Sequence, residues 1–518
     1  AAGLLTGLAV FMAGAHFWVR PHLFTWAAAL LVVALLRTAR RRPARLLVLL
    51  PFQVIWTNLH GGFVLGPAII LGWAAGEEIR RRQGKAGAHP GRVAMTGLLS
   101  AAACLINPYG WSLIRLPFQL TGSELFMQAI FEWQSPFQSA YLTTTMFAGF
   151  LLMVVLLIWT VVRAWDRWDP CDLAVLGLAL LLAVRMSRNV PLFALLAAGP
   201  LAACLGGTGM GKRAARWQFN AAAGILLATA LGLALEGYPY SPGHLRPRGV
   251  GPGPSVPVAA CDFIESHKLS GRAFTTYGEG AYVVWRLWPR VLVGMDSRNS
   301  VYGEDLYGEY RQTLRDPAAT RRYLDRWQPD LAIIGHWGPF RRGWDKERDR
   351  DLDLPHKVFA EPGRMLLVDF DDLTAVYATP RACQMSGIEV SAYEVIHPVL
   401  LPAVFPVSSL GRALEEGKRA VQAHPESVLA HWILAKAYAQ SNRPGEALEQ
   451  LGQISRLDKT RMRRWGLAGS MRAARLGLTG LMQLKEGHCQ AARQALEEAL
   501  KADPDYGPAR DLLANLDC

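Results

Sequence analysis

The first 236 residues of this 518-residue chain consist mainly of apolar runs separated by short polar turns. Ala, Leu, Val, Gly and Trp dominate this part, whereas the acidic residues are concentrated in the remainder. Long apolar runs fold as helices in a lipid bilayer, because a helix satisfies its own backbone hydrogen bonds there. The sequence therefore predicts an α-helical polytopic membrane domain at 1–236, followed by soluble domains.

About nine membrane spans are predicted in this domain. Several of the runs are shorter than the roughly 20 residues of a simple span, so tilted, broken or re-entrant segments are expected among them. The predicted spans are 1–19, 23–36, 46–58, 63–76, 93–106, 142–163, 171–185, 190–205 and 220–236.

The distribution of Lys and Arg over the loops predicts the orientation. Alternating the loops between two sides places 15 Lys and Arg on one side and four on the other. Cytoplasmic loops carry the excess of basic residues, so the richer side is predicted to be cytoplasmic. The net charge of +13 has the same explanation, and nucleic acid is not an expected partner. The last span then leads outside, which predicts a bacterial inner-membrane protein with extracytoplasmic soluble domains.

Unusual polar residues gather in the predicted outside turns. Arg185 and Arg188 are three residues apart, so on a helix they would share a face and meet an anion such as a lipid phosphate. The alternative is that they extend to the lipid headgroups. His60 precedes two glycines at a candidate close-approach turn, and the alternative there is a simple hairpin tip. The candidate binding residues are Arg20, His22, Asn58, His60, Arg185 and Arg188.

The outside loop 112–141 is rich in Phe and predicts an amphipathic segment at the membrane interface. Glu124 and Glu132 are its only acids, and each is a candidate base or metal ligand. A solvated carboxylate at headgroup level is the simpler interpretation. The chain contains no metal-ligand spacing such as C-x-x-C, and the sequence leaves open whether a divalent metal is a cofactor.

The remainder of the chain is predicted to hold two soluble domains. A Pro-rich linker at 237–254 precedes an α/β domain at 255–380, and a second linker at 381–407 precedes helical repeats at 408–518. The predicted strands of the α/β domain are 272–276, 281–287, 290–295, 331–335 and 364–378, and its predicted helical stretches are 256–268 and 305–327.

Two details of these domains bear on function. Asp296 and Arg298 follow a predicted strand, a place where α/β folds bind ligands, although a salt bridge within the turn is the favoured alternative. A disulfide among Cys261, Cys383, Cys489 and Cys518 fits an oxidising compartment, but its pairing is open.

The C-terminal segment has a period of about 34 residues, which is typical of tetratricopeptide repeats. Such arrays bind peptides or partner proteins on a concave face. The residues at repeat positions are Ala413, Ala420, Pro425, Ala435, Tyr438, Ala447, Leu451, Gly480, Ala492, Leu496, Ala499 and Pro504.

Six short strings occur in residues 1–380. They are RPHLF at 20–24, WTNLHGGF at 56–63, NPYG at 107–110, RNVPLF at 188–193, GAYVVWRL at 280–287 and DDLTAVY at 371–377. On these strings the region resembles bacterial polytopic membrane proteins related to the GT-C glycosyltransferases. The resemblance implies transfer of a sugar from a polyprenyl-phosphate carrier on the outer face of the inner membrane.

The same resemblance implies a catalytic acid in the first outside loop, between the first two spans. The chain opens with an apolar run and no initiator Met. The predicted orientation places residue 1 on the cytoplasmic side, which leaves room for two upstream spans and the outside loop between them. We therefore expect that the N-terminal spans are missing and that the catalytic acid lies upstream of this chain. Arg185, Arg188, His22 and His60 would then stabilise the departing polyprenyl phosphate.

Two other functions are compatible with the sequence. An O-antigen ligase or polymerase-like transferase is one, but a large soluble region after the last span disfavours it. A non-catalytic membrane scaffold that recruits partners through its repeats is the other.

Overall fold

The structure is a computed structural model of the chain. It describes residues 2–14, 20–138, 144–206, 224, 239–241, 244–245, 256–336, 354–400, 405–465, 468–502, 507–514 and 516. These residues divide into two compact units, Ala1–Pro242 (unit 1) and Gly243–Cys518 (unit 2).

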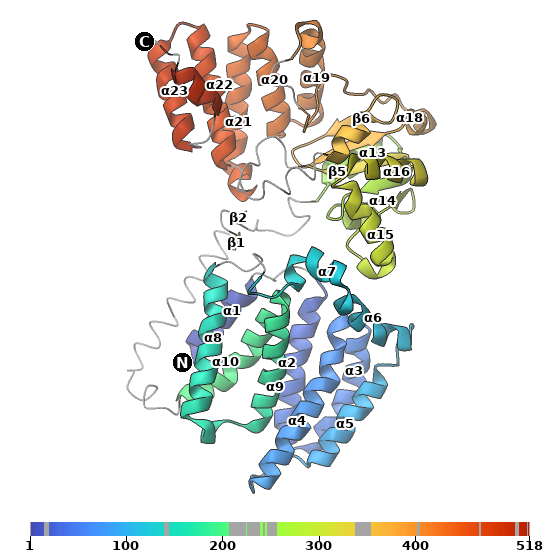
Figure 1. The fold of residues 1–518 in the computed structure, drawn as a ribbon, viewed down its shortest axis with the longest axis vertical. Coiled ribbons are helices and arrows are strands. Elements are labelled where there is room, and N and C mark those ends of the chain that lie inside the picture. The colour runs from blue at the N-terminus through green and yellow to red at the C-terminus, as the bar shows by residue number, and fades with distance from the viewer. Residues whose placement is uncertain are drawn as a thin grey trace. The chain divides into compact units, whose positions relative to one another are not determined.

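Unit 1 is a bundle of helices, drawn in blue and green in Figure 1. Helix α4 packs against α2, α5 and α9, while α10 packs against α1, α8 and α9. Large aromatic side chains fill the interior, and Trp56, Trp73 and Phe193 are almost completely buried. The helices are α1 (Ala2–Ala13), α2 (His22–Ala39), α3 (Leu49–Thr57), α4 (Leu65–Arg82), α5 (Pro90–Ala103), α6 (Trp111–Gly122), α7 (Glu124–Ala129), α8 (Thr144–Arg163), α9 (Pro170–Arg185) and α10 (Val190–Gly206).

Short 3-10 helices connect several of these elements. They are η2 (Pro43–Val48), η3 (Gly61–Val64), η4 (Phe131–Trp133), η5 (Trp165–Arg167) and η6 (Ser187–Asn189).

Four helical segments of the described residues are long and apolar enough to cross a membrane: His22–Ala39, Gly61–Arg82, Met146–Arg163 and Ser187–Gly206. Leu98, Val155 and Val162 leave more than half of their surface exposed. Apolar side chains on the outside of an apolar bundle indicate a lipid environment. The prediction of a membrane protein is therefore confirmed.

At the remaining predicted spans, the helices have fewer than the 18 residues of a candidate membrane span, or the residues are not described. Helices α5 and α9 have 14 and 16 residues, and α1 has 12. The predicted span at 220–236 lies outside the described residues except for residue 224, and so does most of the predicted linker at 237–254. The count of nine spans and the orientation stay predictions.

Unit 2 contains a five-stranded mixed sheet with the order β4-β3-β5-β7-β6. Strand β3 is parallel to β4 and β5, whereas β7 is antiparallel to β5 and β6. The strands are β3 (Gly271–Thr275), β4 (Val291–Val293), β5 (Leu331–Gly335), β6 (Leu366–Phe370) and β7 (Thr374–Ala378). Two short strands precede them in the chain: β1 (Pro239–Ser241) belongs to unit 1, and β2 (His244–Leu245) belongs to unit 2. The helices of this part are α13 (Val258–Ser266), α14 (Gly280–Leu287), α15 (Asn299–Thr313), α16 (Pro317–Trp327) and α18 (Pro380–Ser386).

Two strand predictions need correction. Residues 281–287 were expected to form a strand, but they belong to helix α14, whose buried residues Gly280, Val283 and Leu287 follow helical spacing. The single strand expected at 364–378 is a hairpin of β6 and β7. Asp371 forms its turn, because its Oδ1 accepts the backbone N–H groups of Leu373 at 2.8 Å and Thr374 at 2.7 Å.

The C-terminal part of unit 2 is a row of helices, drawn in orange and red in Figure 1, in which each packs on the next. Small residues at the predicted repeat positions, such as Ala420, Ala435 and Ala492, are fully buried at these contacts. Pro504 lies outside the described residues. The helices are α19 (Leu410–Ala423), α20 (Val428–Gln440), α21 (Pro444–Trp465), α22 (Ala468–Lys485), α23 (Cys489–Ala502) and α24 (Gly507–Ala514).

The sheet and the helical row are joined by direct hydrogen bonds within unit 2. Asp372, in the hairpin turn, accepts the Ser427 hydroxyl at 2.7 Å and the Leu429 amide at 2.8 Å at the start of α20. Asp369 accepts the imidazole of His424 at 2.7 Å. In its described part, the segment predicted as a linker at 381–407 packs against these elements, since Ile396 is buried.

Candidate functional site

The two ends of helices α2, α4 and α9 carry separate groups of polar side chains. One group lies where α2 and α4 begin and α9 ends, and we call it the His60 face. It consists of Arg20, His22, Thr25, His60, Glu132 and Arg188. The other lies where α2 and α4 end and α9 begins, and we call it the Arg40 network. It consists of Arg37, Arg40, Trp73, Glu77, Arg80, Asp169, Cys171 and Asp172.

A chain of hydrogen bonds sets the orientation of His60. Trp56 Nε1 donates to Thr25 Oγ1 at 3.3 Å, and Thr25 Oγ1 lies 2.7 Å from His60 Nδ1. The Gly62 amide also donates to Nδ1, at 3.2 Å. Nδ1 is therefore an acceptor, so Thr25 donates to it. In the neutral ring the hydrogen is then on Nε2, which leaves an N–H donor on the other side of the imidazole.

The sequence around His60 requires this close packing. A Cβ atom on Gly62 would lie 2.3 Å from Thr25 Oγ1, whereas one on Gly61 would meet nothing within 4 Å. Only the second glycine is needed for the close approach. Burial, together with the charges of Arg188 and His22, lowers the pKa of His60 to about 4, so the ring is neutral near pH 7.

Arg20 and Arg188 converge on one carboxylate. Their guanidinium nitrogens lie 3.6 Å and 3.9 Å from the two oxygens of Glu132. Arg188 also lies over the ring of Trp133, 5.7 Å from its centroid. The turn that carries Arg188 is fixed to the same segment, because the Ser187 amide and hydroxyl each bond the Gln134 carbonyl at 2.9 Å.

The other predicted site residues are placed differently. Arg185 was expected to share a helical face with Arg188, but α9 ends at Arg185, and the extended backbone of Met186 separates the two arginines. Among the described residues, no hydrogen bond or ion pair joins Arg185 to the His60 face. Asn58 bonds the carbonyls of Val54 and Ile106, which ties α3 to the turn after α5. His22 stacks edge to face on Trp26, with ring centroids 5.1 Å apart.

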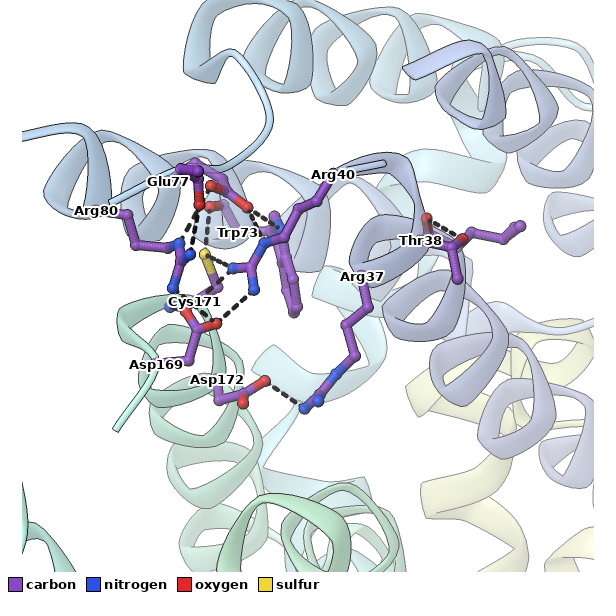
Figure 2. A network of polar contacts seen from close by, with 11 residues as sticks. Arg37, Thr38, Arg40, Trp73, Glu77, Arg80, Asp169, Cys171 and Asp172 are labelled. Carbon is purple, nitrogen blue, oxygen red and sulfur yellow. Dashed lines mark hydrogen bonds and ion pairs between the residues drawn. The ribbon is translucent and has the colours of Figure 1, made fainter. Parts of the chain in front are cut away.

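The Arg40 network is a set of short, buried interactions (Figure 2). Arg40 is its centre: Nε donates to Glu77 at 2.6 Å, and Nη1 donates to Asp169 at 2.5 Å. Its guanidinium also lies over the Trp73 ring, 5.0 Å from the centroid. Arg80 lies 3.3 Å from Asp169, so α2, α4 and the start of α9 are held together through charged groups.

Other members of the network complete this contact between helices. Trp73 Nε1 donates to Glu77 at 3.1 Å, and Arg37 donates to Asp172 at 2.6 Å. A Cβ atom on Gly76 would lie 2.5 Å from the Cα of Cys171, so α4 and α9 touch backbone to backbone at this level. In the sequence, Arg37 and Arg80 are part of the excess of basic residues in the predicted cytoplasmic loops. The acids that face them, Asp172 and Asp169, are more than 80 residues away, so no local pattern indicates the network.

In unit 2 the predicted Asp296 and Arg298 form the salt bridge of a turn. Arg298 donates to both oxygens of Asp296 through Nε at 3.0 Å and 2.9 Å, and Tyr302 adds a hydrogen bond at 2.9 Å. Burial opposes the charge of Asp296, but these hydrogen bonds outweigh it and hold its pKa below the ordinary value. Of the two interpretations of Asp296 and Arg298, the structure therefore shows the salt bridge within the turn.

A buried chain of hydrogen bonds joins His356, Tyr377 of strand β7 and His397. Val399 and Leu400 donate their amides to His397 Nδ1, and the Tyr377 hydroxyl lies 2.7 Å from both His397 Nε2 and His356 Nδ1. Burial lowers the pKa of His397 to about 3 and the pKa of His356 well below its ordinary value. Both rings are neutral, and the chain is part of the core.

Within the described residues, no group of three or more His, Cys, Asp or Glu is arranged to hold a metal ion. No protein-family model matches this chain, and comparisons with curated proteins and with solved structures gave no match.

Proposed function

We propose that unit 1 is the membrane domain of a GT-C-like glycosyltransferase and that its His60 face binds the phosphate of a polyprenyl-phosphate-linked sugar. The observation that supports this proposal is the convergence of Arg20 and Arg188 on Glu132. Two guanidinium groups face one carboxylate, beside the neutral imidazole of His60. Guanidinium groups match the geometry of phosphate oxygens.

The proposed reaction moves one sugar. The oxygen of an acceptor hydroxyl attacks the anomeric carbon, the bond from this carbon to the phosphate oxygen breaks, and that oxygen keeps the electron pair. The hydroxyl proton passes to a carboxylate acting as base, which is not assigned among the described residues. Arg20 and Arg188 would stabilise the departing polyprenyl phosphate, and the Nε2–H of His60 would donate to one of its oxygens.

The proposed location is the bacterial inner membrane with the soluble part outside the cytoplasm. The asymmetric distribution of Lys and Arg over the loops supports this orientation. Cys489 takes part in a disulfide bond, which fits an oxidising compartment.

The proposal is tested with the full-length protein in lipid nanodiscs. Undecaprenyl phosphate binding and sugar transfer from an undecaprenyl-phosphate-linked donor would be compared for the wild type and an Arg20→Ala, Arg188→Ala variant. We expect at least a tenfold loss of affinity and transfer, because charge-assisted hydrogen bonds contribute about 1.5–3 kcal/mol each.

The matched control is an Arg81→Ala, Arg82→Ala variant, which removes two exposed arginines that pair with Glu78 at the other end of α4. It should bind and transfer like the wild type. Equal loss in both variants would indicate unspecific attraction between cations and lipid and would contradict the proposal. If the wild type binds no undecaprenyl phosphate, the proposed alternative is a scaffold that recruits peptide or protein partners through α19–α24.

A further inference from the structure

A cavity of about 590 Å³ lies at one edge of the sheet in unit 2. Four strands meet at this edge: β3 and β5 begin there, β7 ends there, and β6 begins opposite the end of β7, with Ala378 paired to both Leu331 and Leu366. Arg272, Arg364 and Arg381 line the cavity together with Asp325 and Asp330. Its volume is in the range of about 300–1,000 Å³ that is usual for small-molecule sites.

The two acids of the cavity are already engaged. Asp330 Oδ2 accepts the backbone amide of Arg272 at 3.0 Å. Asp325 lies 3.3 Å from Arg364, which also donates to Glu361 at 2.8 Å. The charge of Arg364 is therefore neutralised by Asp325 and Glu361, and Asp330 accepts a hydrogen bond from the backbone at this edge of the sheet.

Arg272 and Arg381 differ from Arg364. Both are exposed at the cavity, and among the described residues neither guanidinium has a hydrogen bond or an ion pair. Two guanidinium groups at one cavity repel each other unless an anion lies between them. The same groups offer several N–H donors in a planar arrangement that matches an oxyanion.

We propose that this cavity binds a sugar-sized anion through Arg272 and Arg381. The ligand class is a monosaccharide that carries a phosphate or carboxylate group, because the volume exceeds that of a lone phosphate ion. Gln328 and Thr379, also at the cavity, supply polar groups for the hydroxyls of the sugar. The site lies within unit 2 and is independent of the function proposed for unit 1.

The experiment is a calorimetric titration of the complete chain in nanodiscs at constant ionic strength. The probes are glucose 1-phosphate, glucuronate and neutral glucose. The variants are Arg272→Ala with Arg381→Ala, the same positions changed to Lys, and Arg290→Ala as an exposed control outside the cavity. Thermal unfolding of each variant checks that it is folded.

We expect an anionic sugar to bind and glucose to bind at least tenfold more weakly. The double Ala variant should lose at least tenfold in affinity, and the double Lys variant should lose less, since lysine keeps the charge without the planar donors. Arg290→Ala should bind like the wild type. The proposal is overturned if neither anionic sugar binds at millimolar concentration, or if the folded double Ala variant binds with unchanged affinity.

Discussion

The two polar ends of helices α2, α4 and α9 use similar residues for different purposes. In the Arg40 network three arginines face three acids, and the shortest contacts are 2.5–2.6 Å. At the His60 face Arg20 and Arg188 lie 3.6 Å and 3.9 Å from Glu132. Residue type alone therefore does not separate a structural group from a candidate binding group, whereas the distance between opposite charges does.

Burial reinforces this difference. The side chain of Glu77 is completely buried, whereas Arg20 at the other end leaves 55% of its side chain exposed. A buried and fully paired group is costly to disrupt, but long ion pairs between partly exposed groups contribute little to stability. The Arg40 network should thus determine the stability of unit 1, and the His60 face should be available for a ligand.

The largest expected effect comes from the Arg40 network. Glu77→Gln removes a buried charge that faces Arg40, and we expect a loss of about 3–5 kcal/mol in the free energy of unfolding. The thermal unfolding midpoint in detergent, followed by circular dichroism, would fall clearly.

Its neighbour provides the control. Glu78 pairs only with the exposed Arg81 and Arg82 in the described structure, so Glu78→Gln should change the free energy of unfolding by less than about 1 kcal/mol. Similar midpoints for the Glu77 and Glu78 variants would mean that the two ends do not differ in their contribution to stability.

The second effect separates Arg188 from Arg185. Arg188→Ala should weaken undecaprenyl phosphate binding about tenfold or more, since one charge-assisted hydrogen bond contributes about 1.5–3 kcal/mol. Arg185→Ala should have a smaller effect, because Met186 separates Arg185 from the His60 face. Binding of fluorescent undecaprenyl phosphate measures both, and equal losses would enlarge the proposed site to include Arg185.

The third effect concerns pH. The folded pKa of His60 is lowered to about 4 from its ordinary value of 6.5. The unfolded chain therefore binds this proton more readily, so the contribution of His60 to stability is fully present above pH 6.5 and is lost as the pH falls toward 4. Between pH 7.5 and pH 5 the unfolding midpoint of the wild type should fall more than that of His60→Gln. Parallel decreases would contradict a buried, neutral His60.

The smallest effect is expected for Glu132→Gln. This change removes the carboxylate that competes with a bound phosphate for Arg20 and Arg188. Surface ion pairs contribute about 0.2–1 kcal/mol, so the affinity for undecaprenyl phosphate should rise by about two- to fivefold. Titration in nanodiscs would measure this, and a decrease in affinity would instead show that Glu132 holds the arginines in position for the ligand.

The sequence predicted features that depend on local patterns. The long apolar helices, the strands β3, β4 and β5, and the presence of helix α13 follow from apolar runs and from alternation that neighbouring residues specify. Residues 281–287 were misassigned because a short apolar segment fits both a buried strand and a helix. Only the packing of Val283 and Leu287 in the sheet domain decides between them.

The candidate sites depended on contacts between distant parts of the chain. Glu132 is more than 50 residues from Arg188, and Asp169 is more than 100 from Arg40, so no local pattern pairs them. His60 could be singled out from the sequence, because the two glycines that follow it are a local signal. The cavity between Arg272 and Arg381 had no sequence signal, since its lining comes from the ends of separate strands.

The hydrogen bonds that Asp369 and Asp372 accept from the start of the helical row have a practical consequence for dividing the chain. A fragment that ends near residue 400 would retain both carboxylates and lose the groups that they bind, His424 and Ser427. A fragment that begins near residue 408 would lose the Asp372 carboxylate that accepts hydrogen bonds at the N-terminus of α20. The natural cutting point for biochemistry is therefore before the sheet, with the sheet and the helices expressed as one piece.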